Sequence, residues 1–197
     1  MIDYRHMVVL GANGGIGKQV VMQALIAGYE VTAILRTPDN LTIQHPNLKV
    51  VQGDVMRAGT LYEHLKGKDV VISAIGQNSL KTTTLYSQGS KNLIASMERT
   101  GVKRAFFISA SGLDVNPKHP LWVRFATKYL LQMILRNPYA DQRIMENIIK
   151  QSAVQWTIST NGFLDNGWSI SRADVAHFIV HNLANPVIIN QTVEVAY

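Results

Sequence analysis

Short, nearly continuous apolar runs alternate along the chain with segments in which apolar residues recur every three or four positions. The apolar runs predict buried strands, and the periodic segments predict amphipathic helices. The predicted strands cover 8–10, 31–35, 48–51, 69–74, 104–109, 154–159 and 191–196. The predicted helices cover 16–27, 60–65, 83–99, 121–135, a segment that starts at 137, and 171–183. This alternation predicts an α/β fold with a parallel sheet covered by helices on both faces.

Polar residues and a proline indicate where two helices of the second half begin. Asn137 followed by Pro138 is typical of an N-cap and a first helical residue. Ser171 and Asp174 have the spacing of a capping box. The helix that starts at 137 is expected to bury Ile144 and Ile148, together with Met145 and Ile149.

Four glycines follow the first predicted strand directly: Gly11, Gly14, Gly15 and Gly17. A strand, a glycine turn and a helix in this order form the context of a dinucleotide fingerprint. Gly11 is expected to turn the chain, Gly14 or Gly15 to let a pyrophosphate approach, and Gly17 to let the helix pack on the sheet. The helix N-terminus would offer free N–H groups to phosphates, which adds Asn13 and Ile16 to the predicted cofactor-binding residues. The alternative is a glycine-rich turn that binds nothing.

Composition narrows the class of protein. Apolar residues make up 47% and charged residues 16% of the 197 residues, which favours one folded domain with a substantial core. The absence of cysteine excludes disulfides, thiolate metal sites and cysteine nucleophiles. No apolar run approaches a membrane span and the N-terminus has no signal-peptide pattern, so we expect a cytoplasmic protein that does not interact with membranes.

The basic charge has two interpretations. The net charge is +6, but the lysines and arginines are scattered and have no interleaved aromatic residues. A basic surface that attracts a polyanionic cofactor is therefore favoured over a nucleic-acid partner. His177 and His181 could share one helix face, and surface histidines are favoured there over a metal site.

The glycine spacings resemble those of short-chain dehydrogenases/reductases. Further stretches resemble the atypical, NmrA-like members, which are related to NAD(P)H-dependent flavin reductases and biliverdin reductase B: 28–36, 52–55, 65–71, 73–76, 101–104, 156–158 and 170–176. The resemblance covers nearly the whole chain. It implies a Rossmann-like doubly wound sheet in a single domain over 1–197, with NADP across the carboxyl ends of the strands and a substrate side built mainly from 112–170.

Charge predicts which dinucleotide is preferred. An NAD-binding protein usually has an acidic residue at the end of the second strand, whereas this chain has Arg36 there. A guanidinium suits the 2′-phosphate of NADP, unless Arg36 is a solvated loop residue. The resemblance implies that Asp54 lies beside the adenine and that Val55 packs on it, with a loop-capping role as the alternative for Asp54. Room for the cofactor is expected at Ala74, Ile75 and Gly76.

The Tyr-x-x-x-Lys pair of alcohol and ketone reductases is not found where it is expected. Tyr62 and Lys66 have the spacing but lie between the third and fourth strands. Tyr139 and Arg143 lie nearer the expected segment, but a guanidinium does not relay a proton as an ammonium does. A site without this pair is better suited to reducing a flavin or quinone, whose reduced anion is delocalised and needs no strong acid.

Ser109 and Ser111 follow the fifth strand and are expected to contact the nicotinamide or the substrate, with a turn-forming role as the alternative. Asn78, Phe163 and Trp168 are candidates for lining the substrate side. The favoured hypothesis is an NADPH-dependent reductase of a small planar acceptor. A non-catalytic NADP(H) sensor with a protein partner is the alternative, and an epimerase or dehydratase is the weakest, because it needs the Tyr–Lys pair.

Overall fold

One parallel sheet of seven strands organises the chain. The computed structural model describes residues 4–77, 79–110, 113, 124–125, 129, 132–161 and 170–195. The strand order is β3-β2-β1-β4-β5-β6-β7, and every neighbouring pair is parallel. The strands are β1 (His6–Leu10), β2 (Glu30–Leu35), β3 (Leu48–Gln52), β4 (Val70–Ser73), β5 (Arg104–Ala110), β6 (Gln155–Asn161) and β7 (Gln191–Val195). The predicted doubly wound, Rossmann-like sheet is confirmed, and its order reverses between β1 and β4, where such sheets bind ligands.

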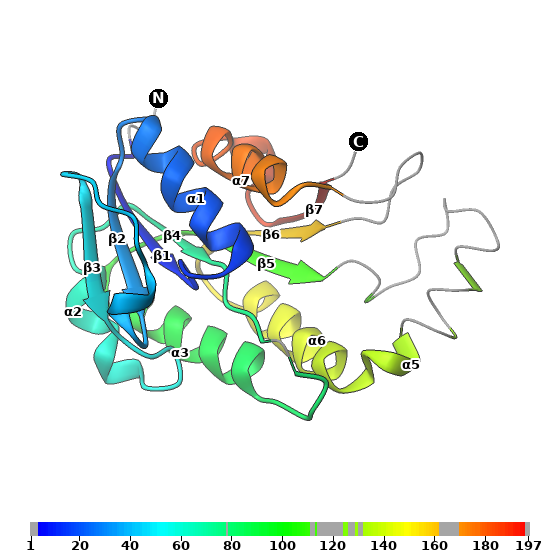
Figure 1. Cartoon of the computed structure of the whole chain (residues 1–197). Helices are drawn as coiled ribbons and strands as arrows, with labels where there is room; N and C mark the ends of the chain where they lie inside the picture. Colours follow the sequence, from blue (N-terminus) through cyan, green and yellow to red (C-terminus); the bar gives the residue numbers. More distant parts are fainter. Residues whose placement is uncertain are drawn as a thin grey trace.

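Helices cover both faces of this sheet (Figure 1). The helices are α1 (Gly15–Ile26), α2 (Tyr62–Leu65), α3 (Leu85–Thr100), α5 (Gln132–Ile134), α6 (Arg136–Lys150) and α7 (Arg172–His181), with short 3₁₀ turns at Pro38–Asn40, Ala58–Thr60 and Pro186–Ile188. Helices α1 and α7 lie on one face, and α3 and α6 lie on the other. Of the helix predicted over 121–135, the structure describes α5 and the short pieces 124–125 and 129.

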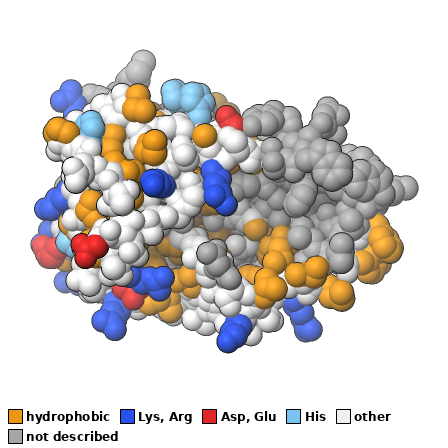
Figure 2. Space-filling model, viewed as in Figure 1, with side chains coloured by type: hydrophobic (Ala, Val, Ile, Leu, Met, Phe, Trp, Pro, Cys, Tyr) orange, Lys and Arg blue, Asp and Glu red, His pale blue; other side chains and the backbone are white. Residues whose placement is uncertain are grey.

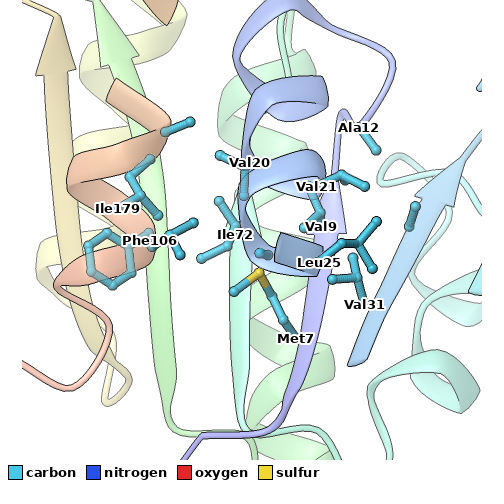
Figure 3. Close-up of a cluster of buried hydrophobic side chains, with 14 of the residues drawn as sticks. Met7, Val9, Ala12, Val20, Val21, Leu25, Val31, Ile72, Phe106 and Ile179 are labelled. Carbon is cyan, nitrogen blue, oxygen red and sulfur yellow. The ribbon is translucent and has the colours of Figure 1, made fainter. Parts of the chain in front are cut away.

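A separate core fills each side of the sheet. Between the sheet and α1 and α7, side chains from four strands and both helices interlock (Figure 3): Met7, Val9, Val20, Val31, Ile72, Phe106 and Ile179. On the other face, the strand residues Val8, Leu10, Val71 and Phe107 pack against the helices. The helix residues that they meet are Leu93 and Met97 of α3 and Met145 and Ile149 of α6. Because both faces are buried, the strands need apolar residues at nearly every position, which explains their continuous apolar runs.

The prediction for the buried side of α6 is partly wrong. Ile144 is 54% exposed, whereas Met145 and Ile149 are fully buried. The buried stripe of α6 includes Met145, Glu146 and Ile149, and Ile144 lies outside it. Asp141 and Gln142 complete that stripe, so polar residues at buried positions displaced it from the side that hydrophobicity alone predicts.

The predicted start of α6 is also wrong, because Asn137 is not its N-cap. The helix begins at Arg136, with Leu135 as the capping residue, and Pro138 lies in the first turn. A proline is tolerated there because the first-turn N–H groups have no acceptor within the helix. Asn137 instead donates its side-chain amide to the Leu80 carbonyl at 3.0 Å. The capping box of α7 is confirmed, since Ser171 Oγ accepts from the Asp174 N–H at 3.1 Å.

Asp141 caps a neighbouring helix across the fold. Its Oδ2 accepts from the Tyr86 N–H at 2.8 Å and from the Ser87 N–H at 3.3 Å, and its Oδ1 accepts from the Ser87 hydroxyl. The α3 N-cap, Thr84, provides no side-chain bond of its own. A buried carboxylate on α6 therefore satisfies the first-turn amides of α3 and interacts favourably with its positive end.

A buried arginine lies at the amino end of β5, an inner strand of the sheet. Arg104 is 1% exposed, and its guanidinium donates to Leu183 O, Gln155 O and Thr157 Oγ1 at 2.7–3.0 Å. Burial lowers its pKa to about 10. These bonds connect β5, β6 and the segment after α7. They lie at the amino ends of the strands, whereas ligands of such sheets bind at the carboxyl ends.

The charged residues that Figure 2 displays are dispersed. Lysines and arginines on this face are separated from one another by polar and hydrophobic atoms and do not merge into one basic stripe. Among the described residues, none of the helices combines the length and the apolar character needed to cross a membrane.

The cap from Asp141 leads to a prediction on stability. Asp141→Ala removes an acceptor of buried donors, so the free energy of unfolding should fall by about 2–3 kcal/mol in urea denaturation. Glu98→Ala, at an exposed acidic position on α3, is the matched control and should change it by less than about 0.5 kcal/mol. Equal effects of the two substitutions would contradict the capping role.

Candidate functional site

A cavity of about 800 Å³ opens at the carboxyl ends of β1, β2, β3, β4 and β5. Predicted cofactor-binding residues that follow the first four of these strands line it: Gly11, Asn13, Gly14, Gly15, Ile16, Arg36, Asp54, Val55, Ala74, Ile75 and Gly76. Ser109 lines it as well, while Gly17 is buried behind the turn. The structure therefore brings together residues that the sequence distributes over several loops.

Close packing of backbone on backbone fixes the turn between β1 and α1. Gly11 has a φ of +74°, and a Cβ on it would lie 2.2 Å from the Ala74 carbonyl oxygen. A Cβ on Gly17 would lie 2.2 Å from the carbonyl oxygen of Gly11. Neither position has room for a side chain, so Gly17 acts in helix packing, as predicted.

The N-terminus of α1 is bare of side-chain caps. Gly14 is the N-cap, without a capping side chain, and the first turn contains no acidic residue. The first amide bonded to a helix carbonyl is that of Lys18, which donates to Gly14 O at 2.9 Å. The N–H groups of Gly15, Ile16 and Gly17 therefore have no acceptor within the helix, and the positive end of the helix dipole adds to their attraction for an anion.

The two central glycines have different surroundings. A Cβ on Gly14 would lie 3.2 Å from the Gly11 carbonyl oxygen, which is a tight contact, and Gly14 lines the cavity. The space above Gly15 is filled by Arg172, whose Cδ, Nε and Nη1 lie 2.5–2.7 Å from where a Cβ would be. Arg172 is a cavity-lining residue that the sequence analysis missed, because it lies in α7, far along the chain.

Arg36 lies where β2 ends, at one end of the cavity, and its side chain is exposed. Its backbone carbonyl accepts from the Gln52 side-chain amide at 3.3 Å. Within the described ranges no acidic side chain pairs with its guanidinium. An unpaired cation at this position has the placement expected for binding the 2′-phosphate of NADP.

Asp54 has the loop-capping contacts that were the alternative to a role beside the adenine. Its Oδ1 accepts from the Met56 N–H at 2.9 Å, and Thr60 Oγ1 accepts from the Asp54 N–H at 2.9 Å. Val55 is buried, and its carbonyl accepts from the Asn92 side chain at 2.9 Å, which ties the loop to α3. Both residues line the cavity, so the loop is a preformed wall.

Ser109 lies at the other end of the cavity, at the end of β5, and is 2% exposed. Its hydroxyl donates to Glu146 Oε1 at 2.7 Å, and Glu146 Oε2 accepts from Lys150 Nζ at 3.0 Å. Because the serine proton points to Glu146, the lone pairs of its oxygen are left to accept from a ligand.

Gln142 is a second cavity residue that the sequence analysis missed. It lies on α6, four residues before Glu146, and is 8% exposed. Its Oε1 has no hydrogen-bond partner among the described residues. A buried amide oxygen without a partner is costly, so this atom is a candidate acceptor for a ligand N–H or O–H group. The helical spacing of Gln142 to Glu146 is the signal that the sequence offers for it.

The two tyrosine–cation pairs do not build a proton-relay site in the described cavity. Burial raises the pKa of Tyr139, which is not among the cavity-lining residues. Arg143 donates to the Leu113 carbonyl. Tyr62 begins α2 and Lys66 follows its last residue, and the Lys66 ammonium binds Glu63 at 2.8 Å. Neither Tyr62 nor Lys66 is among the residues that line the described cavity.

Four predicted residues, Ser111, Asn78, Phe163 and Trp168, lie outside the described residues, as does most of the segment 112–131. The rings of His177 and His181 are 3.9 Å apart at the surface. No cluster of three or more potential metal ligands occurs in the part of the chain that the structure describes.

The chain matches two curated relatives over only part of their length. A photosystem II assembly factor, Ycf39 of Synechocystis, is 28% identical over 120 residues, which are 59% of this chain and 37% of the relative. Isoflavone reductase of Medicago sativa is 27% identical over 136 residues, with 59% of this chain and 41% of the relative covered. The chain thus spans well under half the length of these relatives.

Solved structures match the fold over nearly the whole chain. A candidate epimerase from Bacteroides thetaiotaomicron has a TM-score of 0.81 at 23% identity, with 99% of this chain and 98% of that chain covered. The anaerobillin reductase ChuY of Escherichia coli O157:H7 has a TM-score of 0.77 at 18% identity, with 96% of this chain and 95% of that chain covered. A short-chain dehydrogenase/reductase of Veillonella parvula in complex with NADP has a TM-score of 0.75 at 17% identity, with 99% of this chain and 95% of that chain covered. At these identities the likeness establishes the fold alone.

The family model described as NAD(P)H-binding matches residues 11–169, from the first glycine of the turn to the end of the segment after β6. This match includes the strand ends that form the cavity, and the fold is that of short-chain dehydrogenase/reductase structures. The chain therefore belongs to the NAD(P)H-binding family.

Proposed function

We propose that this protein is an NADPH-dependent oxidoreductase that transfers hydride to a small planar acceptor such as a flavin or quinone. One observation carries the proposal: the uncapped first turn of α1 and the unpaired guanidinium of Arg36 line the same cavity. NADP carries the pyrophosphate that all such dinucleotides share and a 2′-phosphate that NAD lacks, and the cavity offers positive partners for both groups.

The residues at each end of the cavity fit the two halves of such a cofactor. Arg36 and Val55 lie at the end formed by β2 and its following loops, which suits the adenosine half. Ser109 and Gln142 lie at the end formed by β5 and α6, and both offer acceptor oxygens. The carboxamide and the ribose hydroxyls of a nicotinamide nucleoside carry N–H and O–H donors that match them. NADPH, when bound, supplies the hydride, and the protein supplies its position.

The acceptor class follows from the tyrosine–lysine pair that the described cavity lining lacks. Reduction of a ketone leaves an alkoxide that requires a positioned proton donor. Tyr86 lines the cavity, but the described lining has no lysine beside it, and Tyr139 is not part of the lining. Reduction of a flavin or quinone leaves a delocalised anion that water can protonate. The name of the structural neighbour ChuY, an anaerobillin reductase, is consistent with an acceptor of this conjugated kind.

A second function is favoured by the similarity to Ycf39, which is named as an assembly factor. In this alternative the chain binds NADP(H) without turnover and passes the redox state to a protein partner. The epimerase hypothesis keeps its weakness, because the described cavity does not contain a tyrosine–lysine pair.

The test is NADPH oxidation by the purified protein, followed at 340 nm with a panel of flavins and quinones. Turnover with at least one acceptor, faster with NADPH than with NADH, is expected. NADPH binding by calorimetry without turnover on any acceptor would overturn the reductase and favour the sensor. Failure to bind NADPH or NADH would overturn both.

Arg36→Ala tests the preference for NADP. Loss of one charge-assisted contact should weaken NADP binding by about 1.5–3 kcal/mol, which is roughly ten- to a hundredfold, and leave NAD binding within about twofold. Calorimetry with both dinucleotides measures this, and Arg57→Ala, at an exposed position outside the cavity lining, is the control. A parallel loss for NADP and NAD would contradict the assignment of Arg36 to the 2′-phosphate.

Ser109→Ala tests the nicotinamide end. The substitution removes an acceptor from the cavity and leaves Glu146 Oε1 without its donor, so kcat/KM for NADPH should fall by about tenfold. Ser96→Ala, a buried serine on α3 outside the cavity lining, controls for the loss of a buried hydroxyl. The role fails if steady-state kinetics show the same kcat/KM for both variants.

A further inference from the structure

We propose that Arg172 is a second cofactor-binding cation, which contacts the pyrophosphate above the N-terminus of α1 and therefore serves NADP and NAD equally. The inference rests on the proposed dinucleotide binding. It concerns a residue beyond the part of the chain that the family model matches, which ends at 169.

Helix packing brings Arg172 to the glycine turn. Helices α1 and α7 lie side by side on one face of the sheet (Figure 1), and the Gln23 side chain donates to the Ala173 carbonyl at 2.8 Å. From the first position of α7, the Arg172 side chain extends to Gly15, the first residue of α1. Its Cδ, Nε and Nη1 lie within 2.7 Å of the position that a Cβ on Gly15 would take. The guanidinium therefore lies directly beside the free amides of α1.

The electrostatic surroundings of Arg172 favour an anion. The residue is at the positive end of its own helix and is held against the positive end of α1, and a cation at either place is unfavourable. No acidic partner of Arg172 is found in the described part of the chain, and Asp174, the acid in the first turn of α7, bonds with Ser171. A phosphate at the mouth of α1 would accept from the guanidinium and from the backbone amides together.

A second residue of the cavity lining supports a ligand in this cavity. Gln142 lines it on the side of β5 and α6, and its buried amide oxygen has no hydrogen-bond partner among the described residues. A dinucleotide that spans Arg36 and Gln142 must pass the N-terminus of α1, where Arg172 lies. Arg36 would bind the 2′-phosphate, which only NADP has, and Arg172 would bind the pyrophosphate, which NADP and NAD share.

Calorimetry with three ligands separates the two arginines. Arg172→Gln should weaken NADP and NAD by the same factor, about ten- to a hundredfold, because both carry the pyrophosphate. Arg172→Gln should leave the affinity for 2′-AMP within about twofold of the wild-type value, because that ligand has the 2′-phosphate but no pyrophosphate. Arg57→Gln, which removes a cation of the same kind outside the cavity lining, should leave all three affinities unchanged within about twofold.

Gly15→Ala provides a second variant that leaves Arg172 chemically intact. The added methyl group would occupy the space of the guanidinium stem, so the variant should also weaken NADP and NAD by one common factor. In the double variant with Arg172→Gln, the combined loss should be smaller than the product of the two single losses, because both act on the same contact. Arg172→Lys, which keeps the charge, should recover part of the affinity if Arg172→Gln folds poorly.

Unchanged binding of NADP and NAD by Arg172→Gln, in a protein whose wild type binds them, would overturn the role of Arg172 and leave the proposed function standing. A loss confined to NADP and 2′-AMP would overturn it as well, since it would assign Arg172 to the 2′-phosphate. Failure of the wild type to bind either dinucleotide would overturn the proposed function itself, which is a distinguishable result.

Discussion

The contact between the β1–α1 turn and the end of β4 is the constraint on which the rest of the site depends. The Cα atoms of Gly11 and Gly17 approach carbonyl oxygens so closely that no side chain fits at either position. This contact sets α1 against the sheet with its N-terminus at the carboxyl ends of the strands. The strand order reverses at the same place, so the bare amides of the helix face a crevice that the topology has already opened. The positions of Arg36, Asp54 and Ser109 matter because they surround this one helix end.

Much of the fold was predictable because its signals are local or periodic. Strands buried on both faces, such as β1, β2 and β4, appear as continuous apolar runs and were found in this way. The edge strands β3 and β7 were also predicted, although they are only partly buried. The glycine turn and the capping box of α7 have fixed spacings that reflect local backbone geometry. The predictions failed on α6, where Asp141 and Gln142 take buried positions. Hydrophobic periodicity cannot locate a stripe that includes polar residues, because their burial depends on partners elsewhere: the amides of α3 for Asp141 and the cavity for Gln142.

The candidate site divides in the same way. Residues within recognisable motifs, such as Gly11, Gly14 and Arg36, were identified from the sequence and line one cavity. Gln142 and Arg172 were missed, since each reaches the cavity only through the packing of its helix on the sheet. For Asp54 the structure shows the loop-capping contact, and its role beside the adenine stays a prediction for a residue that lines the cavity. Local sequence thus locates the glycine turn, and tertiary packing decides which distant side chains line the cavity beside it.

The overlap between Gly15 and Arg172 has an evolutionary consequence. The two positions are far apart in the chain but share one small volume, which an arginine stem now fills. A lineage that acquires a side chain at position 15 must shorten or redirect residue 172 in the same or a neighbouring step, and a lineage that loses the arginine no longer needs glycine there for that reason. The two positions should therefore covary among homologues that keep this helix packing, while Gly11 and Gly17, which are held against backbone atoms, stay invariant whatever residue 172 becomes.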